Sequence, residues 1–293
     1  MKYIYLFTFY LLVALVSFFG AYSCRNAKDK YTGPIGYNLN KPEKFTMPSS
    51  LLEISGIAFY HNNSDTVYSI QDEDGRVYRQ GWGVKKQAHV KFSAKGDYED
   101  LAIMAERLFV LKSNGTFFAF PMSEMLKKDA EQVKEFKKVL PKGEYEGVYA
   151  DESSSKLYVI CKSCEVDKKS KQVTGYVITY YSNLDSMEVS DTFKLDLNQI
   201  KAVNPDAKAS LSPSALTRNP NTKEWYILSS ANKQLVIADE RWQIKAVYKL
   251  NSSTFNQPEG IAFDTNLNLF ISNEGDEVSE GNILKFKYTA PKH

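Results

Sequence analysis

The sequence predicts an all-β fold, and three observations support that prediction. Of the 293 residues, 19 are Tyr and 17 are Phe, and aromatic side chains are enriched in β-strands. Short segments of alternating apolar and polar residues follow one another along the chain, separated by polar turns. One motif recurs at intervals of roughly 45 residues. A repeat of this length, made of short strands, is typical of a β-propeller, so we expect five four-stranded antiparallel blades packed in a ring.

Five copies of the motif define the predicted blades. They are ISGIAF (54–59), YEDLAI (98–103), YEGVYA (145–150), PSALTR (213–218) and QPEGIAF (257–263). One aligned column contains Gly56, Asp100, Gly147, Ala215 and Gly260, at spacings of 44, 47, 68 and 45 residues. We interpret the long interval as two loop insertions, 163–174 and 196–212, and a sixth blade is the alternative. A short amphipathic surface helix is expected over 123–136.

The chain ends are expected to close the ring. The last motif leaves room for about three strands before the end of the sequence. The segment 35–47 resembles 248–257, which precedes the last motif, so we expect 35–47 to supply the missing outer strand. Closure would make 35–293 one domain and remove an open sheet edge. An aromatic residue recurs at one position of each blade and is expected between blades: Tyr68, Phe109, Tyr158, Tyr226 and Phe270.

Residues 1–23 resemble a secretory signal peptide. Lys2 precedes an apolar run over 3–19, and small residues then lead to Cys24, a pattern similar to a bacterial lipobox. It predicts cleavage before Cys24, lipidation of the thiol and a polar tether over 24–34. The expected location is the cell envelope, anchored to a bacterial membrane (the outer membrane favoured), with the domain in the periplasm or on the cell surface. A retained membrane anchor is the alternative, because ~17 apolar residues approach the length of a membrane-spanning helix.

The charge balance and the rare residue types exclude several classes of function. The chain has 37 Lys and Arg against 35 Asp and Glu, which excludes a strongly basic nucleic-acid binder. Three His and three Cys argue against a His-rich metal site, a zinc ribbon and Ser–His catalysis. Cys161 and Cys164 form a CxxC pair, which in an exported protein indicates a local disulfide or two free thiols. The acidic segment 72–75 is similar to part of a calcium loop, but flanking strands favour a hairpin turn.

The ordered set of motifs resembles the SdiA-regulated (YjiK-like) family of bacterial propeller proteins. The last copy, PEGIAFDTNLNLFISNEG, is also similar to an NHL repeat. The resemblance covers about residues 36–288. It implies an exported or lipid-anchored propeller with a divalent-cation site, and it implies no particular reaction.

A column of carboxylates is expected at one mouth of the channel. The inner strands of a propeller run parallel to one another, so equivalent positions form a ring around the axis. The column before the aligned glycines contains Ser55, Glu99, Glu146, Ser214 and Glu259. Three glutamates at close range repel one another, and Ca²⁺, or Mg²⁺, would neutralise them, so we predict that Glu99, Glu146 and Glu259 bind a metal. Carboxylates screened by channel water or bonded to backbone N–H groups are the alternative.

A second ring is expected at the same mouth, because the second strand of each blade runs back toward it. The predicted ligand-binding residues at these strand ends are Gln71, Asp72, Lys112, Lys162, Ser229, Asn273 and Glu274. Two lysines lie on one side, and Asp72 and Glu274 lie on the other. Such a polarised site suits a small anionic ligand or a metal-bound anion. Direct pairing of the lysines with the Glu ring is the alternative.

These features predict a binding protein of the cell envelope. Its propeller would recognise a small anionic ligand or an envelope protein with the help of a divalent cation. The alternative is a metal-dependent hydrolase, lactonase- or phosphoesterase-like, at the central channel. A structural scaffold without a ligand is a third possibility. The sequence identifies no catalytic residue.

Overall fold

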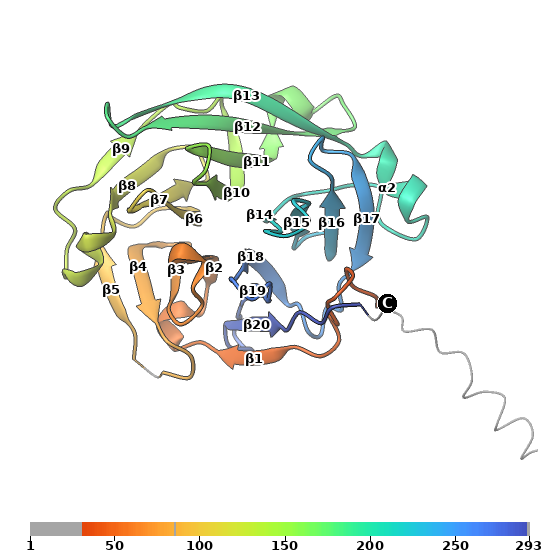
Figure 1. Cartoon of the computed structure of the whole chain (residues 1–293), viewed down its shortest axis with the longest axis horizontal. Coiled ribbons are helices and arrows are strands. Elements are labelled where there is room, and N and C mark those ends of the chain that lie inside the picture. Colours follow the sequence, from red (N-terminus) through yellow and green to blue (C-terminus); the bar gives the residue numbers. More distant parts are fainter. Residues whose placement is uncertain (1–30, 85, 292–293) are drawn as a thin grey trace, which may run out of the picture.

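The computed structural model describes residues 31–84 and 86–291, and these form a five-bladed β-propeller (Figure 1). Each blade in the described part of the chain is a four-stranded antiparallel sheet. This confirms the predicted fold and excludes a sixth blade there. The predicted signal peptide (1–23), Cys24 and most of the tether lie outside the described residues. No helix within the described ranges has the length and apolar character needed to cross a membrane.

The blades follow one another around the ring in chain order. From the innermost strand outward, blade 1 contains β2 (Ile54–Phe59), β3 (Val67–Gln71), β4 (Asp74–Gln80) and β5 (Ala88–Lys91). Blade 2 contains β6 (Tyr98–Met104), β7 (Arg107–Lys112), β8 (Phe117–Pro121) and β9 (Lys134–Phe136). Blade 3 contains β10 (Gly143–Asp151), β11 (Lys156–Cys164), β12 (Gln172–Tyr181) and β13 (Ser186–Asp196). Blade 4 contains β14 (Ala215–Arg218), β15 (Trp225–Ser229), β16 (Gln234–Ala238) and β17 (Ile244–Lys249).

Blade 5 closes the ring in the predicted way. Its strands are β18 (Gln257–Phe263), β19 (Leu269–Glu274), β20 (Asn282–Phe286) and, outermost, β1 (Glu43–Thr46). β1 pairs antiparallel with β20, so Glu43 lies opposite Lys285 and Thr46 opposite Asn282. The pairing covers an edge that would otherwise expose unpaired backbone groups.

The few helical turns lie between strands. They are η1 (Ser49–Leu51), η2 (Tyr60–Asn62), η3 (Met122–Leu126), η4 (Glu165–Asp167) and α2 (Asn198–Val203). The 68-residue interval contains α2, but it also contains the ten-residue β12 and the eleven-residue β13. The length of the interval therefore comes from the long outer strands of blade 3 as well as from the two predicted insertions.

The prediction of a helix over 123–136 is wrong. This segment contains only the short turn η3, followed by extended chain and the outer strand β9. Blade 2 needs a fourth strand, and Phe136 supplies it by pairing with Phe117 and packing in the core. The buried Glu124 holds the connecting loop, because its carboxylate accepts a hydrogen bond of 2.7 Å from the backbone N–H of Glu131. Tertiary packing has overridden a helical periodicity.

The core is divided among the five seams between neighbouring blades. Each seam contains one member of the predicted aromatic column: Tyr68, Phe109, Tyr158, Tyr226 and Phe270. A fully buried ring such as Phe109 or Phe270 contributes roughly 2–3 kcal/mol. The aromatic content of the sequence therefore goes mainly into the packing of blade on blade.

Polar contacts also join the inner strands around the channel. The Ser55 hydroxyl donates to the Glu99 carbonyl at 2.5 Å, and the Ser214 hydroxyl donates to the Pro258 carbonyl at 2.7 Å. The buried Asp100 carboxylate accepts the backbone N–H of Val148 from the next blade at 2.8 Å. A Cβ added at Gly260 would lie 2.6 Å from the Ser55 carbonyl oxygen, so this position has no room for a side chain. The aligned column of the motif is thus the line of closest approach between blades.

Candidate functional site

The three predicted glutamates lie at equivalent breaks in strand pairing. On the inner strand β6, Tyr98 pairs with Lys112 and Asp100 pairs with Leu111, so Glu99 has no partner in the ladder. The same shift in register occurs at Glu146 and at Glu259. A β-bulge of this kind re-aims the side chain of the extra residue. Three bulges at one level therefore bring three carboxylates to one end of the channel, which we call the mouth.

The carboxylates at the mouth interact electrostatically. Burial and the charge of Glu146 raise the pKa of Glu259 to about 7, although the Ser230 hydroxyl and the charges of Lys162 and Lys233 act to lower it. Burial also raises the pKa of Glu99, together with the charges of Glu146, Asp97 and Glu259. The structure thus brings together the predicted Glu column, in which like charges oppose ionisation.

Two acidic residues of the second ring also have raised pKa values. Burial, with the charges of Glu259 and Asp72, raises the pKa of Glu274 to about 8. Burial and the charge of Glu53 raise the pKa of Asp72 to about 6. One oxygen of the Asp72 carboxylate is buried without a hydrogen-bond partner. The mouth therefore has an acidic side formed by blades 5 and 1, as the sequence predicted.

The cationic side differs from the expectation in one residue. Lys162 is at the mouth, where its ammonium group pairs with Glu146 at 2.6 Å. Burial lowers the pKa of Lys162, but the bond to Glu146 more than offsets this and raises it overall. Lys112 instead lies over the ring of Tyr98, with Nζ 5.8 Å from the ring centroid. Of the two lysines predicted from the strand ends, Lys162 pairs with a carboxylate of the Glu column, and Lys112 contacts Tyr98 instead.

The second lysine at the mouth is Lys233, which was not predicted from the sequence. Lys233 lies four residues beyond the end of β15, and its ammonium group donates to the Asn256 carbonyl. Burial lowers the pKa of Lys233, and the nearby Glu259 carboxylate opposes that shift. Lys233 lies outside the strand-end column that the motif aligns. The position of Lys233 depends on the turn that follows, which the strand pattern does not specify.

The remaining predicted ligands have structural partners. The Gln71 amide donates to the Glu53 carboxylate at 2.9 Å, beside Asp72. Ser229 is fully buried, and its hydroxyl donates to the Ser212 carbonyl at 2.6 Å. Asn273 is also fully buried, and its amide donates to Asn282 at 3.1 Å. Ser229 and Asn273 therefore hold the strand ends in place and lie beneath the mouth surface.

A cavity of about 300 Å³ opens at the mouth between blades 3, 4 and 5. Its charged walls are formed by Glu146, Lys162, Lys233 and Glu259. Ser212 and Pro213 complete one wall, so the insertion 196–212 reaches this face. A cavity of this volume fits a small ligand, and such a ligand would contact both cationic and anionic side chains.

The three glutamates do not form a ready-made chelate. Nowhere in residues 31–84 and 86–291 do three His, Cys, Asp or Glu side chains group closely enough to hold one metal ion. Glu146 is engaged by Lys162. The donor chemistry of Glu99 and Glu259 suits a hard cation such as Ca²⁺, but the protein alone offers such a cation an incomplete set of ligands.

Two minor sequence features are resolved by the structure. Cys161 and Cys164 form a disulfide on strand β11, on either side of Lys162. The acidic segment 72–75 forms the β3–β4 hairpin turn and the start of β4, and Asp74 forms an ion pair with Arg76. The calcium-loop alternative therefore lacks the helices that it would need.

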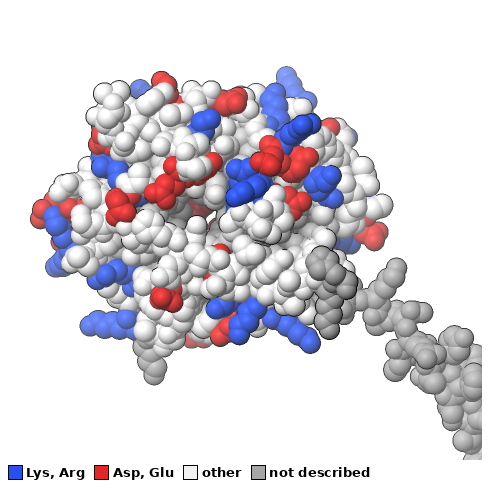
Figure 2. All heavy atoms as spheres, in the orientation of Figure 1, with Lys and Arg blue, Asp and Glu red and all other residues white. Residues whose placement is uncertain are grey.

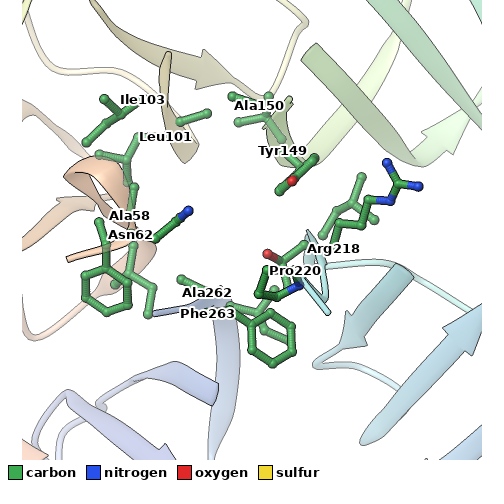
Figure 3. A pocket seen from close by; sticks show the side chains of 17 residues that line it. Ala58, Asn62, Leu101, Ile103, Tyr149, Ala150, Arg218, Pro220, Ala262 and Phe263 are labelled. Carbon is green, nitrogen blue, oxygen red and sulfur yellow. The ribbon is translucent and has the colours of Figure 1, made fainter. Parts of the chain in front are cut away.

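The opposite end of the channel is narrow and mostly apolar. A pocket of about 90 Å³ lies there, and Figure 3 shows side chains from the ends of all five inner strands pointing around it. One of its few polar residues is Arg218. Its guanidinium group already donates to the Glu240 carboxylate at 2.5 Å and lies 5.2 Å from the centroid of the Trp225 ring. On the face shown in Figure 2, acidic and basic side chains are interspersed without a broad patch of one sign. The charged cavity at the mouth is therefore the stronger candidate site.

The fold and the mouth define a β-propeller with a polarised cavity at one end of its channel. The chain belongs to the SdiA-regulated family, whose model matches residues 46–277. A search of curated proteins found no match.

Similar solved structures share the fold at low sequence identity. One is the PQQ-bound aldose sugar dehydrogenase from Streptomyces coelicolor, at 12% identity and a TM-score of 0.54, covering 88% of this chain and 100% of that chain. Another is the glutaminyl cyclase from Myxococcus xanthus, at 12% identity and a TM-score of 0.53, covering 84% and 95%. A luciferin-regenerating enzyme aligns at 11% identity and a TM-score of 0.50, covering 85% and 98%. At these identities the likeness shows the fold alone.

Proposed function

We propose that the protein is a binding module that recognises a small anionic ligand at the mouth, in a cation-dependent manner. The observation that supports this most directly is the cavity of about 300 Å³ with Lys162 and Lys233 in its walls beside Glu146 and Glu259. Two ammonium groups suit the oxygens of a phosphate or carboxylate group. An acidic side chain of an envelope protein carries the same charge and is the corresponding protein partner.

The cation has a physical role at this site. Burial and mutual repulsion raise the pKa values of Glu99, Glu259 and Glu274. A divalent cation, Ca²⁺ or else Mg²⁺, would neutralise them and favour the ionised forms. Because the carboxylates alone leave its ligand set incomplete, oxygens of an anionic ligand would complete it. Binding of cation and binding of anion should therefore strengthen each other.

Titration calorimetry tests both parts of the proposal. The purified protein is titrated with CaCl₂ and MgCl₂, and then with inorganic phosphate in the presence and absence of Ca²⁺. We expect Ca²⁺ to bind and to tighten the binding of phosphate. Replacing Lys233 with Met removes one charge-assisted contact and should weaken phosphate binding by about 10-fold or more.

Lys112→Met is the matched control, because Lys112 lies over Tyr98 and outside the cavity. Its phosphate affinity should equal that of the wild-type protein. The proposal fails if neither cation binds, if phosphate does not bind with Ca²⁺ present, or if both lysine variants lose affinity equally.

We further propose that Cys24 carries the lipid anchor of the protein at the cell envelope, with the outer membrane favoured. The lipobox-like sequence supports this part. Expression of the full chain in a bacterium with labelled fatty acid should label the wild-type protein and fractionate it with membranes. Cys24→Ser should abolish both signals, whereas Cys161→Ser with Cys164→Ser should keep them. Label that persists in Cys24→Ser would contradict the assignment.

A hydrolase is the second candidate, and Glu259 is the observation that favours it. A carboxyl group with a pKa of about 7 in a cavity is suited to general acid–base catalysis. Lactone and phosphate-ester panels would be assayed with Ca²⁺ and with EDTA. Turnover that disappears with EDTA and in Glu259→Gln would favour the hydrolase over simple binding.

A further inference from the structure

A second cavity, larger than the one at the mouth, lies in the seam between blades 4 and 5. Its volume is about 490 Å³. The β14–β15 loop and the β18–β19 turn both border it, and these connections follow the carboxyl ends of inner strands. The mouth is formed at the opposite, amino ends of the same strands. The two cavities therefore lie at opposite ends of the blades and are independent sites.

Ring closure builds one wall of this cavity. Pro34 and Ile35 come from the segment before β1, and Tyr288 and Pro291 come from the segment after β20. In Figure 1 these two segments run together beside β17. They are joined by a hydrogen bond of 2.9 Å from the Thr289 N–H to the Gly36 carbonyl. The wall is thus a defined part of the folded ring.

Three tyrosine rings line the cavity. Tyr226 and Tyr248 come from strands β15 and β17 of blade 4, and Tyr288 comes from the segment after β20. Tyr226 is held edge-on by Phe263, with ring centroids 5.0 Å apart. Tyr37 supports Tyr288 from behind at 5.5 Å, and its hydroxyl donates to the Leu267 carbonyl at 2.6 Å. Tyr248 and Tyr288 also pack against the core cluster that contains Tyr226, so the rings are positioned before any ligand arrives.

Polar side chains also line the cavity. Asn221 and Thr222 come from the β14–β15 loop, which Asn219 holds by accepting both of their backbone N–H groups at 2.9 and 3.0 Å. Glu224 and Lys245 contribute one charge of each sign, so the walls carry no net charge. This differs from the mouth, where buried carboxylates repel one another.

We propose that this tyrosine cavity binds a neutral saccharide. A sugar ring has an apolar face of C–H groups, which matches a tyrosine ring, and an edge of hydroxyl groups, which matches amide, hydroxyl and carboxylate side chains. A cavity of about 490 Å³ accommodates one or two sugar rings. A charged ligand finds no compensating net charge here, and a purely apolar ligand would leave the polar groups unpaired.

Saturation-transfer NMR with the full-length protein tests this proposal. The probes are glucose, galactose, N-acetylglucosamine and their disaccharides, with glucuronate and glucosamine as charged analogues. We expect at least one neutral sugar to receive saturation and to bind more tightly than its charged analogues. Tyr248→Ala should weaken that binding about tenfold, and Glu224→Gln should weaken it severalfold. Tyr248→Phe should retain most of the affinity, because it keeps the ring.

Tyr181→Ala is the matched control, since Tyr181 is an exposed tyrosine of blade 3 that bonds to Glu188. It should leave sugar binding unchanged. The absence of binding by every neutral sugar would overturn the proposal. Binding that survives both Tyr248→Ala and Glu224→Gln would also overturn it. Thermal unfolding of each variant shows that a loss of binding does not come from misfolding.

Discussion

Replacing Glu259 with Gln should make the protein more stable above neutral pH. The side chain lies at a bulge of β18, among Glu99, Glu146 and Glu274. Glutamine has nearly the same shape but cannot ionise. The variant therefore removes one charge from a crowded, partly buried group of carboxylates and leaves the packing in place.

The size and the pH range follow from the pKa. The pKa of Glu259 is about 7 in the folded protein, against an ordinary value of 4.5. The folded form thus holds its proton more tightly than the unfolded form. Stability falls as the pH rises from about 4.5 to about 7, and then stays level. At 1.36 kcal/mol for each pH unit, the loss is at most about 3 kcal/mol, and water in the channel reduces it.

Urea unfolding at pH 4.5 and pH 8, with EDTA present, measures this effect. Glu259→Gln should match the wild-type protein at pH 4.5 and exceed it by about 1–3 kcal/mol at pH 8. Glu277→Gln, at an exposed carboxylate of the same blade, should change stability little at either pH. If the gain is absent at pH 8, or equal at both pH values, repulsion at the mouth is not its cause.

At pH 8, calcium should reverse the order of stability of the wild-type protein and Glu259→Gln. A cation at a hundredfold excess over its dissociation constant stabilises a protein by about 2.7 kcal/mol, provided that it binds only the folded form. The wild-type protein should gain this stability, and Glu259→Gln should gain less. Equal gains in both proteins would show that Glu259 takes no part in cation binding.

Three further predictions concern the scaffold. Gly260→Ala should lower the free energy of unfolding by about 1–3 kcal/mol in urea titrations, because its Cβ would lie 2.3 Å from a neighbouring hydroxyl oxygen; an unchanged midpoint would contradict close packing there. Deleting 35–47 removes β1 and leaves β20 uncovered, so size-exclusion chromatography should show aggregation; a stable monomer would show that closure is dispensable. Reducing the Cys161–Cys164 disulfide should cost about 2 kcal/mol, as measured by thermal unfolding; no change on reduction would refute that contribution.

The blades were predictable because they repeat. Five copies of one motif place five inner strands, and the aromatic column then falls into the five seams, Phe109 and Phe270 among them. The closing strand was predictable because 35–47 resembles a segment at the equivalent place in another blade. The structure of 123–136 was not predictable from its own sequence. Its helical periodicity is a property of that segment alone, whereas the need for a fourth strand in blade 2 is a property of the whole fold. Repetition supplies information about tertiary structure that a single segment lacks.

The site was predictable at the inner strands and less so beyond them. Glu99, Glu146 and Glu259 precede the column of closest approach between blades, so the motif itself places them at one level. Lys233 depends instead on the turn that follows β15, and Lys112, the last residue of β7, contacts Tyr98 and does not line the cavity. A strand pattern shows which end of a blade a residue occupies, but the turn decides whether its side chain enters the cavity.

One local feature connects the packing of the ring with the chemistry of its mouth. The inner strands approach so closely that residues such as Gly147 and Gly260 have no room for a side chain. The preceding residue lies at a bulge, and its side chain is free of the ladder. The side chains of Glu99, Glu146 and Glu259 can therefore vary with little effect on blade packing, whereas Ser55 and Ser214 in the same column bond to the next blade. In this chain four of the five blades, all except blade 4, have an acid at the bulge or at the adjacent end of the second strand, and blade 4 has Lys233 instead. The polarity of the mouth is thus set blade by blade, and a substitution at one of these three glutamates should alter binding there without disturbing the ring.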